Sequence, residues 1–120
     1  MSSERRTYPR YSIHTDVLVS MPGPAESTSD FTVESINVSL AGIQLSCNGD
    51  LITALLEQPK LPFGCTVHFN LPSNEHRFVL GSQYLSYRRK SQRDFVMVVI
   101  FLHEDEQQKQ LLEALLTGMM

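Results

Sequence analysis

The chain has 120 residues, which is enough for one domain of ordinary size with its own hydrophobic core. Apolar residues make up 42% and charged residues 19%, a balance that is typical of globular proteins and excludes a disordered chain. The net charge of -3 argues against a protein that coats nucleic acid or an anionic membrane through bulk charge, so any anion site must be local.

Membrane and secretory segments are not recognisable in the sequence. No stretch approaches the roughly 18 consecutive apolar residues of a membrane helix, and the polar, basic N-terminus lacks the apolar region of a secretory signal. Cys47 and Cys65 are too few and too far apart to suggest a disulfide framework or a zinc site. We therefore expect a cytoplasmic protein without membrane insertion, with two reduced and partly buried thiols.

Short segments of alternating apolar and polar residues, separated by Gly, Pro and Asn turns, predict six strands. In chain order these segments span residues 13–19, 31–38, 43–47, 66–71, 77–89 and 95–102. The fifth segment is long, and Gly81 predicts a bulge within it because glycine relaxes the local backbone. The sixth is a continuous apolar run, which predicts a strand covered on both faces.

Two helices are predicted. Apolar residues at helical spacing from Leu51 to Leu56 indicate a short helix that ends before Pro59. A second helix begins at Asp105, where Gln108 fits a capping box, and its apolar face carries four leucines. These are Leu111, Leu112, Leu115 and Leu116. We expect this face to pack on the barrel and cover the last strand rather than to form a dimer face.

The predicted elements define a mainly β fold, a six-stranded antiparallel β-barrel over residues 13–120 that ends in a C-terminal α-helix. Residues 1–12 have no apolar periodicity and are predicted to form a flexible arm in front of the barrel.

Two clusters of polar residues stand out. Residues 5–10, Arg-Arg-Thr-Tyr-Pro-Arg, hold three of the ten basic residues of the chain. Residues 37–42, Asn-Val-Ser-Leu-Ala-Gly, follow the second predicted strand. Each cluster alone has an ordinary interpretation: the first as a solvated tail, the second as a turn whose Asn and Ser cap the backbone. Their joint occurrence favours a ligand site.

Together the two clusters resemble the two-part signature of the PilZ family, which is R-x-x-x-R near the start followed by [D/N]-x-S-x-x-G. The matching residues are Arg6 and Arg10, with Arg5 completing a double arginine, and then Asn37, Ser39 and Gly42. The order of arm, barrel and C-terminal helix also matches, so the resemblance covers the whole chain. The chain departs from the family in its last predicted strand, residues 95–102, which contains no glycine.

This resemblance implies a receptor for the bacterial second messenger cyclic di-GMP, which the family often binds as a stacked, intercalated dimer. The residue types suit that ligand, because a planar guanidinium can address guanine O6 and N7 together, stack on a base or pair with a phosphate. Asn37 and Ser39 offer short polar side chains. Gly42 suits either a left-handed turn or a close approach of the ligand to the backbone.

The arm also suggests a switch. Ordering one residue costs roughly 1–2 kcal/mol, and the arm has little apolar surface to offset that cost. We expect the arm to be loose without ligand and residues 4–12 to become ordered on binding. Because 120 residues leave no room for an output domain, the altered surface is expected to act on a separate downstream effector protein.

Catalytic equipment is not recognisable: the sequence shows no Ser/His/Asp grouping, phosphate-cradling loop or paired carboxylates, so we expect no enzymatic activity and no cofactor. The histidines lack the close spacing of metal ligands. A basic cluster at Arg88, Arg89, Lys90 and Arg93 flanks a predicted hairpin turn. It is interpreted first as a solvated turn, while an extension of the ligand site or a partner contact remains open.

Two alternatives compete with the receptor hypothesis. One is an adaptor for other proteins that keeps the PilZ fold without needing ligand, although such family members usually lack the arginine motif. The other is a small β-barrel that binds single-stranded nucleic acid, which would require a basic groove with exposed aromatic platforms. The acidic composition and the absence of Trp disfavour that second alternative.

Overall fold

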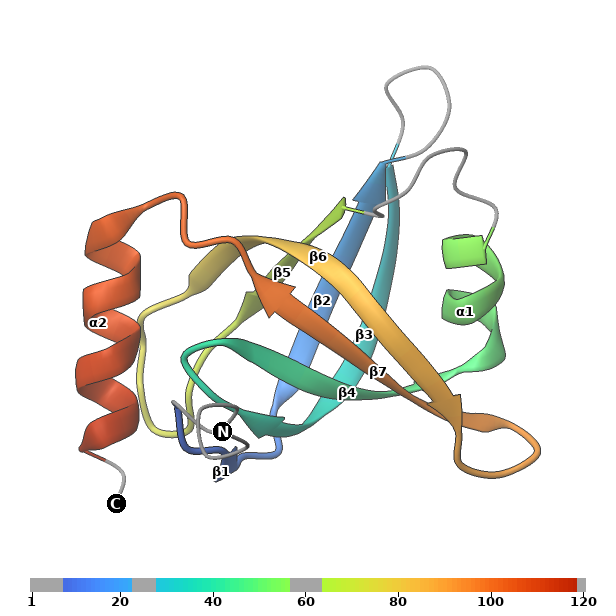
Figure 1. The fold of residues 1–120 in the computed structure, drawn as a ribbon, viewed down its shortest axis with the longest axis horizontal. Helices are drawn as coiled ribbons and strands as arrows, with labels where there is room; N and C mark the ends of the chain where they lie inside the picture. The colour runs from blue at the N-terminus through green and yellow to red at the C-terminus, as the bar shows by residue number, and fades with distance from the viewer. Residues whose placement is uncertain (1–7, 23–27, 57–63, 119–120) are drawn as a thin grey trace, which may run out of the picture.

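The computed structural model describes residues 8–22, 28–56 and 64–118. Its elements are β1 (Tyr11–Ser12), β2 (Asp16–Pro22), β3 (Thr28–Val38), β4 (Gly42–Asn48), α1 (Gly49–Leu56), β5 (Gly64–Phe69), β6 (Phe78–Arg89), β7 (Asp94–Phe101) and α2 (Glu106–Thr117). The six predicted strands are all present as β2 to β7, with ends that differ by a few residues. Figure 1 shows them wrapped around one interior, with the two helices at opposite ends of the view.

The strands close into a barrel. Each of β2 to β7 pairs antiparallel with two neighbours, in the cyclic order β2, β3, β4, β7, β6, β5 and back to β2. The predicted six-stranded antiparallel barrel with a C-terminal helix is therefore confirmed. Closure leaves none of these six strands with a fully open edge, which removes the sites where another chain could add a strand.

Alternation along the strands builds the core. In β4 and β5 every second side chain is buried and its neighbours are half-buried or exposed, the pattern of a strand with one face inward. The largest fully buried side chains come from most elements of the fold: Val17, Val19, Met21, Val38, Ile43, Leu45, Leu51, Phe69, Phe78, Met97 and Leu112. Phe69 stacks on Phe78 and Phe101 with ring centroids 5.5 and 6.1 Å apart.

The first predicted strand, residues 13–19, begins only at Asp16 in β2, and the short β1 lies in the predicted arm, residues 1–12. β1 pairs with the end of β3, β2 pairs with the rest of it, and residues 13–15 break the ladder between them. The buried side chain of Ser35 fills this break: its hydroxyl donates to the Ile13 carbonyl at 2.6 Å and accepts from the Thr15 amide at 3.0 Å. These two bonds satisfy backbone groups that a missing ladder would leave unpaired.

Two bulges interrupt the ladders, and neither lies where the sequence predicted one. One is in β3 between Ser35 and Asn37, and the other is in β6 between Tyr84 and Ser86. Gly81 instead pairs regularly with Thr66. A side chain at Gly81 would meet the Glu104 carboxylate, since an added Cβ would lie 2.8 Å from its Oε1. Because the Glu104 side chain is exposed and can move, this contact does not by itself require glycine.

Both helices contribute apolar side chains to the core, as predicted. Leu112 and Leu116 of α2 are almost fully buried in it, and so are Leu51 and Ile52 of α1. α2 does not cover the outer side of β7, however. It stands beside one end of the barrel (Figure 1), and Leu102 at the end of β7 is 46% exposed. The prediction that α2 covers this strand is wrong.

The start of α2 is close to the prediction. Asp105 is the N-cap, and its carboxylate accepts from the amides of Gln107 and Gln108 at 2.9 and 3.3 Å. The Gln108 side chain does not complete the capping box, because its Oε1 accepts instead from Nε2 of His76 at 3.1 Å. This bond fixes α2 against the loop between β5 and β6. Among the described residues, no helix has the length and hydropathy to cross a membrane.

The two thiols give the first prediction. Cys47 and Cys65 are free and buried, and burial raises the pKa of each thiol from 9.0 to about 11. At pH 8 both should therefore react slowly with a thiol reagent in the folded protein and rapidly in denaturant. Labelling followed by mass spectrometry checks this, and native labelling should rise as the pH approaches 11. Immediate reaction of both thiols at pH 8 without denaturant would contradict the burial described here.

Candidate functional site

The end of the arginine arm and the β3–β4 turn lie next to each other. β1 pairs with β3 so that Tyr11 is opposite Val38 and Ser12 is opposite Asn37. Arg10 directly precedes β1 and is exposed. Two motifs that are far apart in the sequence therefore meet at one strand pair. Arg5 and Arg6, the other two arginines predicted to bind ligand, lie outside the described residues.

The bulge in β3 determines where Asn37 points. Ser35 is inward and almost fully buried, so simple alternation would turn Asn37 inward as well. The extra residue between them reverses this, and Asn37 pairs with Gln44 of β4 on the outer side of the barrel. The Asn37 amide donates from Nδ2 to Oε1 of Gln44 at 3.0 Å. Across β4, Gln44 is opposite Val98 of β7.

The Ser39 side chain holds the turn between β3 and β4. Its hydroxyl oxygen accepts from the amides of Ala41 and Gly42 at 3.1 and 3.2 Å, and its own amide donates to the Gly42 carbonyl at 2.8 Å. The side chain is buried, with 8% exposed. The interpretation of this motif as a capped turn is therefore correct for Ser39, whose hydroxyl shapes the loop beside Asn37.

Gly42 is required by a close approach of two strands. No glycine among the described residues has a positive φ, so the left-handed alternative does not apply. An added Cβ at Gly42 would lie 2.2 Å from the Val99 carbonyl oxygen and 3.1 Å from Cα of Ile100. The backbone that approaches Gly42 is thus that of β7, the neighbouring strand in the barrel.

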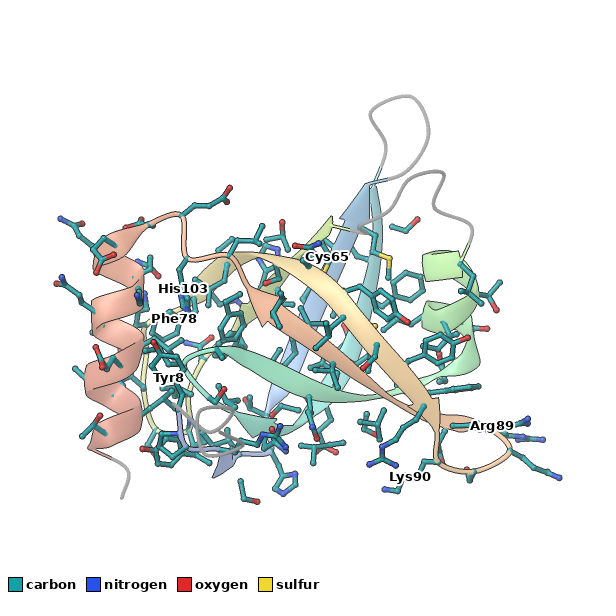
Figure 2. The ribbon with its side chains drawn as sticks, viewed as in Figure 1. Tyr8, Cys65, Phe78, Arg89, Lys90 and His103 are labelled. Atoms are coloured by element: carbon teal, nitrogen blue, oxygen red, sulfur yellow. The ribbon has the colours of Figure 1, made fainter. Side chains whose placement is uncertain are left out.

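Two further contacts tie this turn to the end of β7. The Phe101 amide donates to the Ala41 carbonyl at 2.9 Å, and Nε2 of His103 donates to the Leu40 carbonyl. His103 has a φ of 53°, an uncommon value for a residue with a side chain, and it leads into α2. In Figure 2 it lies between the barrel and α2. The turn is therefore held from three sides, by Ser39, by β7 and by the connection to α2.

The outer surface beside the turn is partly apolar. Val98 and Ile100 of β7 are half-buried, and they lie opposite Gln44 and Gly42 respectively. Within the described part of the chain, Oδ1 of Asn37 and Nε2 of Gln44 have no hydrogen bond. This face thus combines a half-buried apolar floor, one free amide acceptor and one free amide donor.

A small pocket of about 70 Å³ lies between the end of the arm, the turn and α2. Its lining comes from the end of the arm, from the turn and from α2: Tyr8, Pro9, Tyr11, Leu40, Glu113, Leu116 and Thr117. Figure 2 shows Tyr8 beside α2. Tyr8 and Pro9 therefore lie beside the helix, while Ser12 and Asn37 lie on the outer side of the barrel.

The structure brings together Arg10, Asn37, Ser39 and Gly42 from the sequence prediction. Of the basic cluster, Arg89 and Lys90 lie on the β6–β7 hairpin, at the opposite side of the view from α2 (Figure 2). Sequence analysis missed Gln44, although its alternation in β4 after Gly42 would have placed it outward. The described residues contain no group of three or more His, Cys, Asp and Glu side chains able to hold a metal ion.

The close approach at Gly42 yields the second prediction. Gly42→Ala should lower the free energy of unfolding by roughly 2–4 kcal/mol, because β4 and β7 must separate to admit the methyl group. Gly64→Ala is the matched control, since its added Cβ has no neighbour nearer than 3.9 Å. Urea denaturation compares the two. Equal stability of both variants would show that the two strands do not lie this close.

No family profile and no curated protein matches the chain. Solved structures do. The chain is similar to the Bacillus subtilis inhibitor of motility MotI/DgrA, with 18% identity, a TM-score of 0.67 and coverage of 92% of this chain and 48% of that one. It is also similar to Escherichia coli YcgR in complex with c-di-GMP, with 16% identity, a TM-score of 0.66 and coverage of 96% and 46%.

The chain thus spans about half the length of both proteins. The PilZ domain of Escherichia coli YcgR with c-di-GMP matches over 95% of this chain and 90% of that domain, with 16% identity and a TM-score of 0.60. At such identities the likeness concerns the fold. Together with the closed barrel and the C-terminal helix, it shows that the chain has the PilZ-domain fold.

Proposed function

We propose that this protein is a receptor for cyclic di-GMP, which it binds between the arginine arm and the outer face of β3, β4 and β7. The observation that supports this most strongly is the pairing of β1 with β3, which joins the end of the R-x-x-x-R arm to the N-x-S-x-x-G turn. Similarity to YcgR and its PilZ domain, both solved with c-di-GMP, points to the same ligand.

In this proposal the arm supplies the charge. Arg5, Arg6 and Arg10 pair with the phosphates and address O6 and N7 of guanine, since a guanidinium forms two parallel hydrogen bonds with such acceptors. Within the described part of the chain, the Arg10 side chain has no acidic partner and is exposed. Its charge is therefore not already neutralised by the protein.

The barrel supplies the shape of the site. Ser39 and Gly42 fix the turn, so that Asn37 keeps its outward position beside Gln44. The free acceptor of Asn37 and the free donor of Gln44 complement guanine, which carries N2–H donors and an O6 acceptor. The half-buried side chains of Val98 and Ile100 offer an apolar surface on which a base can rest.

This function is that of a binding protein and not of an enzyme, and it needs no metal or cofactor. Binding orders the arm, and the surface formed by arm and barrel then contacts a downstream effector protein. We place the receptor in the cytoplasm, where its two thiols stay reduced. The second ligand molecule of an intercalated dimer would be held by the same arginines.

Calorimetric titration with cyclic di-GMP provides the third prediction. The wild type should bind at micromolar or lower concentration, while Arg6→Ala and Arg10→Ala should each weaken binding at least tenfold, because each loses a charge-assisted hydrogen bond. Cyclic di-AMP should bind much more weakly, since adenine has no O6.

Arg77→Ala is the matched control for these two variants. It removes the same charge from an exposed residue next to the β5–β6 loop, whose guanidinium donates to Asn70 at 3.0 Å. Ser39→Ala is less informative, because it also removes the bonds that hold the turn. A wild type that ignores cyclic di-GMP would leave the ligand-independent adaptor as the better hypothesis.

Ordering of the arm is the fourth prediction. We expect the backbone amides of residues 4–10 to be mobile on the nanosecond timescale without ligand, because the polar arm cannot offset its ordering entropy. Saturating cyclic di-GMP should rigidify them. Steady-state heteronuclear NOE values of the free and bound protein measure this change, with the amides of Tyr11 and Ser12 in β1 as an internal reference. High values for residues 4–10 in the free protein would rule out the switch.

A further inference from the structure

The arginines of the basic hairpin differ in their contacts. Arg89 donates from Nε to the Ser91 carbonyl at 3.1 Å and from Nη2 to the Gln92 carbonyl at 3.0 Å, and its guanidinium lies 6.0 Å from the centre of the Phe95 ring. These contacts hold the hairpin. The neighbouring guanidinium of Arg88 is exposed and has no hydrogen bond or ion pair with any other described residue.

Arg88 lies on the outer side of the barrel. The register of β4, β7 and β6 forms two adjacent rows across these strands, first Gln44, Val98 and Ser86, then Ser46, Val96 and Arg88. The inward side chains of β7 alternate with these rows, as the buried Met97 and Val99 show. The row of Arg88 is therefore next to the row that contains Gln44 of the proposed site.

The two residues are within reach of one ligand. Arg88 and Gln44 are separated by two strand spacings and one row, so their Cα atoms lie about 12 Å apart along the surface. An extended arginine side chain covers a large part of that distance, and a cyclic dinucleotide is wide enough to cover the rest. Figure 1 shows β4, β7 and β6 side by side on the near side of the barrel, facing the viewer together.

Acidic side chains also lie along this row. Beyond Ser46 it continues to Glu34 of β3 and Asp16 of β2, and Asp94 of β7 follows next to the row. Arg10 lies at the β1 side of the proposed site and Arg88 at the β6 side, with the amides of Asn37 and Gln44 between them. A cyclic dinucleotide presents two phosphates on opposite sides of its ring.

We propose that Arg88 is a second anion contact of the same site, which binds the phosphate that the arm does not reach. This inference rests on the proposed function, because it names a further residue for the same ligand. Arg88 thus belongs to the binding site, whereas Arg89 belongs to the hairpin fold and Arg93 to its solvated tip.

Titration of three variants with cyclic di-GMP tests this assignment. Arg88→Ala should weaken binding roughly tenfold, since a charge-assisted contact to a phosphate is lost. Arg93→Ala is the matched control: it removes the same charge from an exposed residue of the same hairpin and should change the affinity less than twofold. Arg88→Met keeps an unbranched side chain and removes only the guanidinium, so it should behave as Arg88→Ala does.

The outcomes separate this inference from the proposed function. If the wild type binds cyclic di-GMP and Arg88→Met binds equally well, the inference is wrong and the receptor function stands. If Arg88→Met and Arg93→Ala weaken binding to the same extent, the effect is one of general charge and the inference is also wrong. A wild type without affinity for the nucleotide overturns both. Loss of affinity in Arg88→Met alone, with an unchanged thermal midpoint, supports the contact.

Discussion

The bulge in β3 decides which side chains the barrel offers to a ligand. It reverses the alternation between Ser35 and Asn37, so that Ser35 faces the core and Asn37 faces outward beside Gln44. The hydroxyl of Ser35 stabilises this geometry through its bonds to Ile13 and Thr15, each of which contributes about 1 kcal/mol. The same bonds fix the break between β1 and β2, and β1 carries the end of the arginine arm.

The turn after the bulge connects the proposed site to α2. The Leu40 carbonyl accepts a hydrogen bond from His103, and the Ala41 carbonyl accepts one from the Phe101 amide at the end of β7. His103 then leads into α2, whose side chains also line the pocket beside Tyr8. A ligand that moves the arm or the turn therefore acts on contacts that reach the helix. This continuity gives the proposed receptor a route from its binding face to a surface for an effector protein.

Local patterns predicted the strands well because alternation and turn residues are properties of neighbouring positions. The N-cap region of α2 and the turn at residues 40–42 followed from the same kind of signal. Local signals did not predict the position of α2, the two bulges or the close approach that requires Gly42. Each of these depends on which strands lie next to each other in the barrel. Gly81 shows the limit: it was predicted to lie at a bulge, but it pairs regularly with Thr66. Gln44 and Arg88 join the site only through the register of β4, β7 and β6.

The central claim is that cyclic di-GMP binds on the outer face beside the β3–β4 turn. The most direct measurement is a series of ¹H–¹⁵N correlation spectra of the labelled protein during titration with the nucleotide. The account predicts saturable shifts of the amides of Asn37, Gly42 and Gln44, together with those of the arm. Spectra that stay unchanged at saturating nucleotide, or shifts confined to α1 and the far end of the barrel, would contradict it.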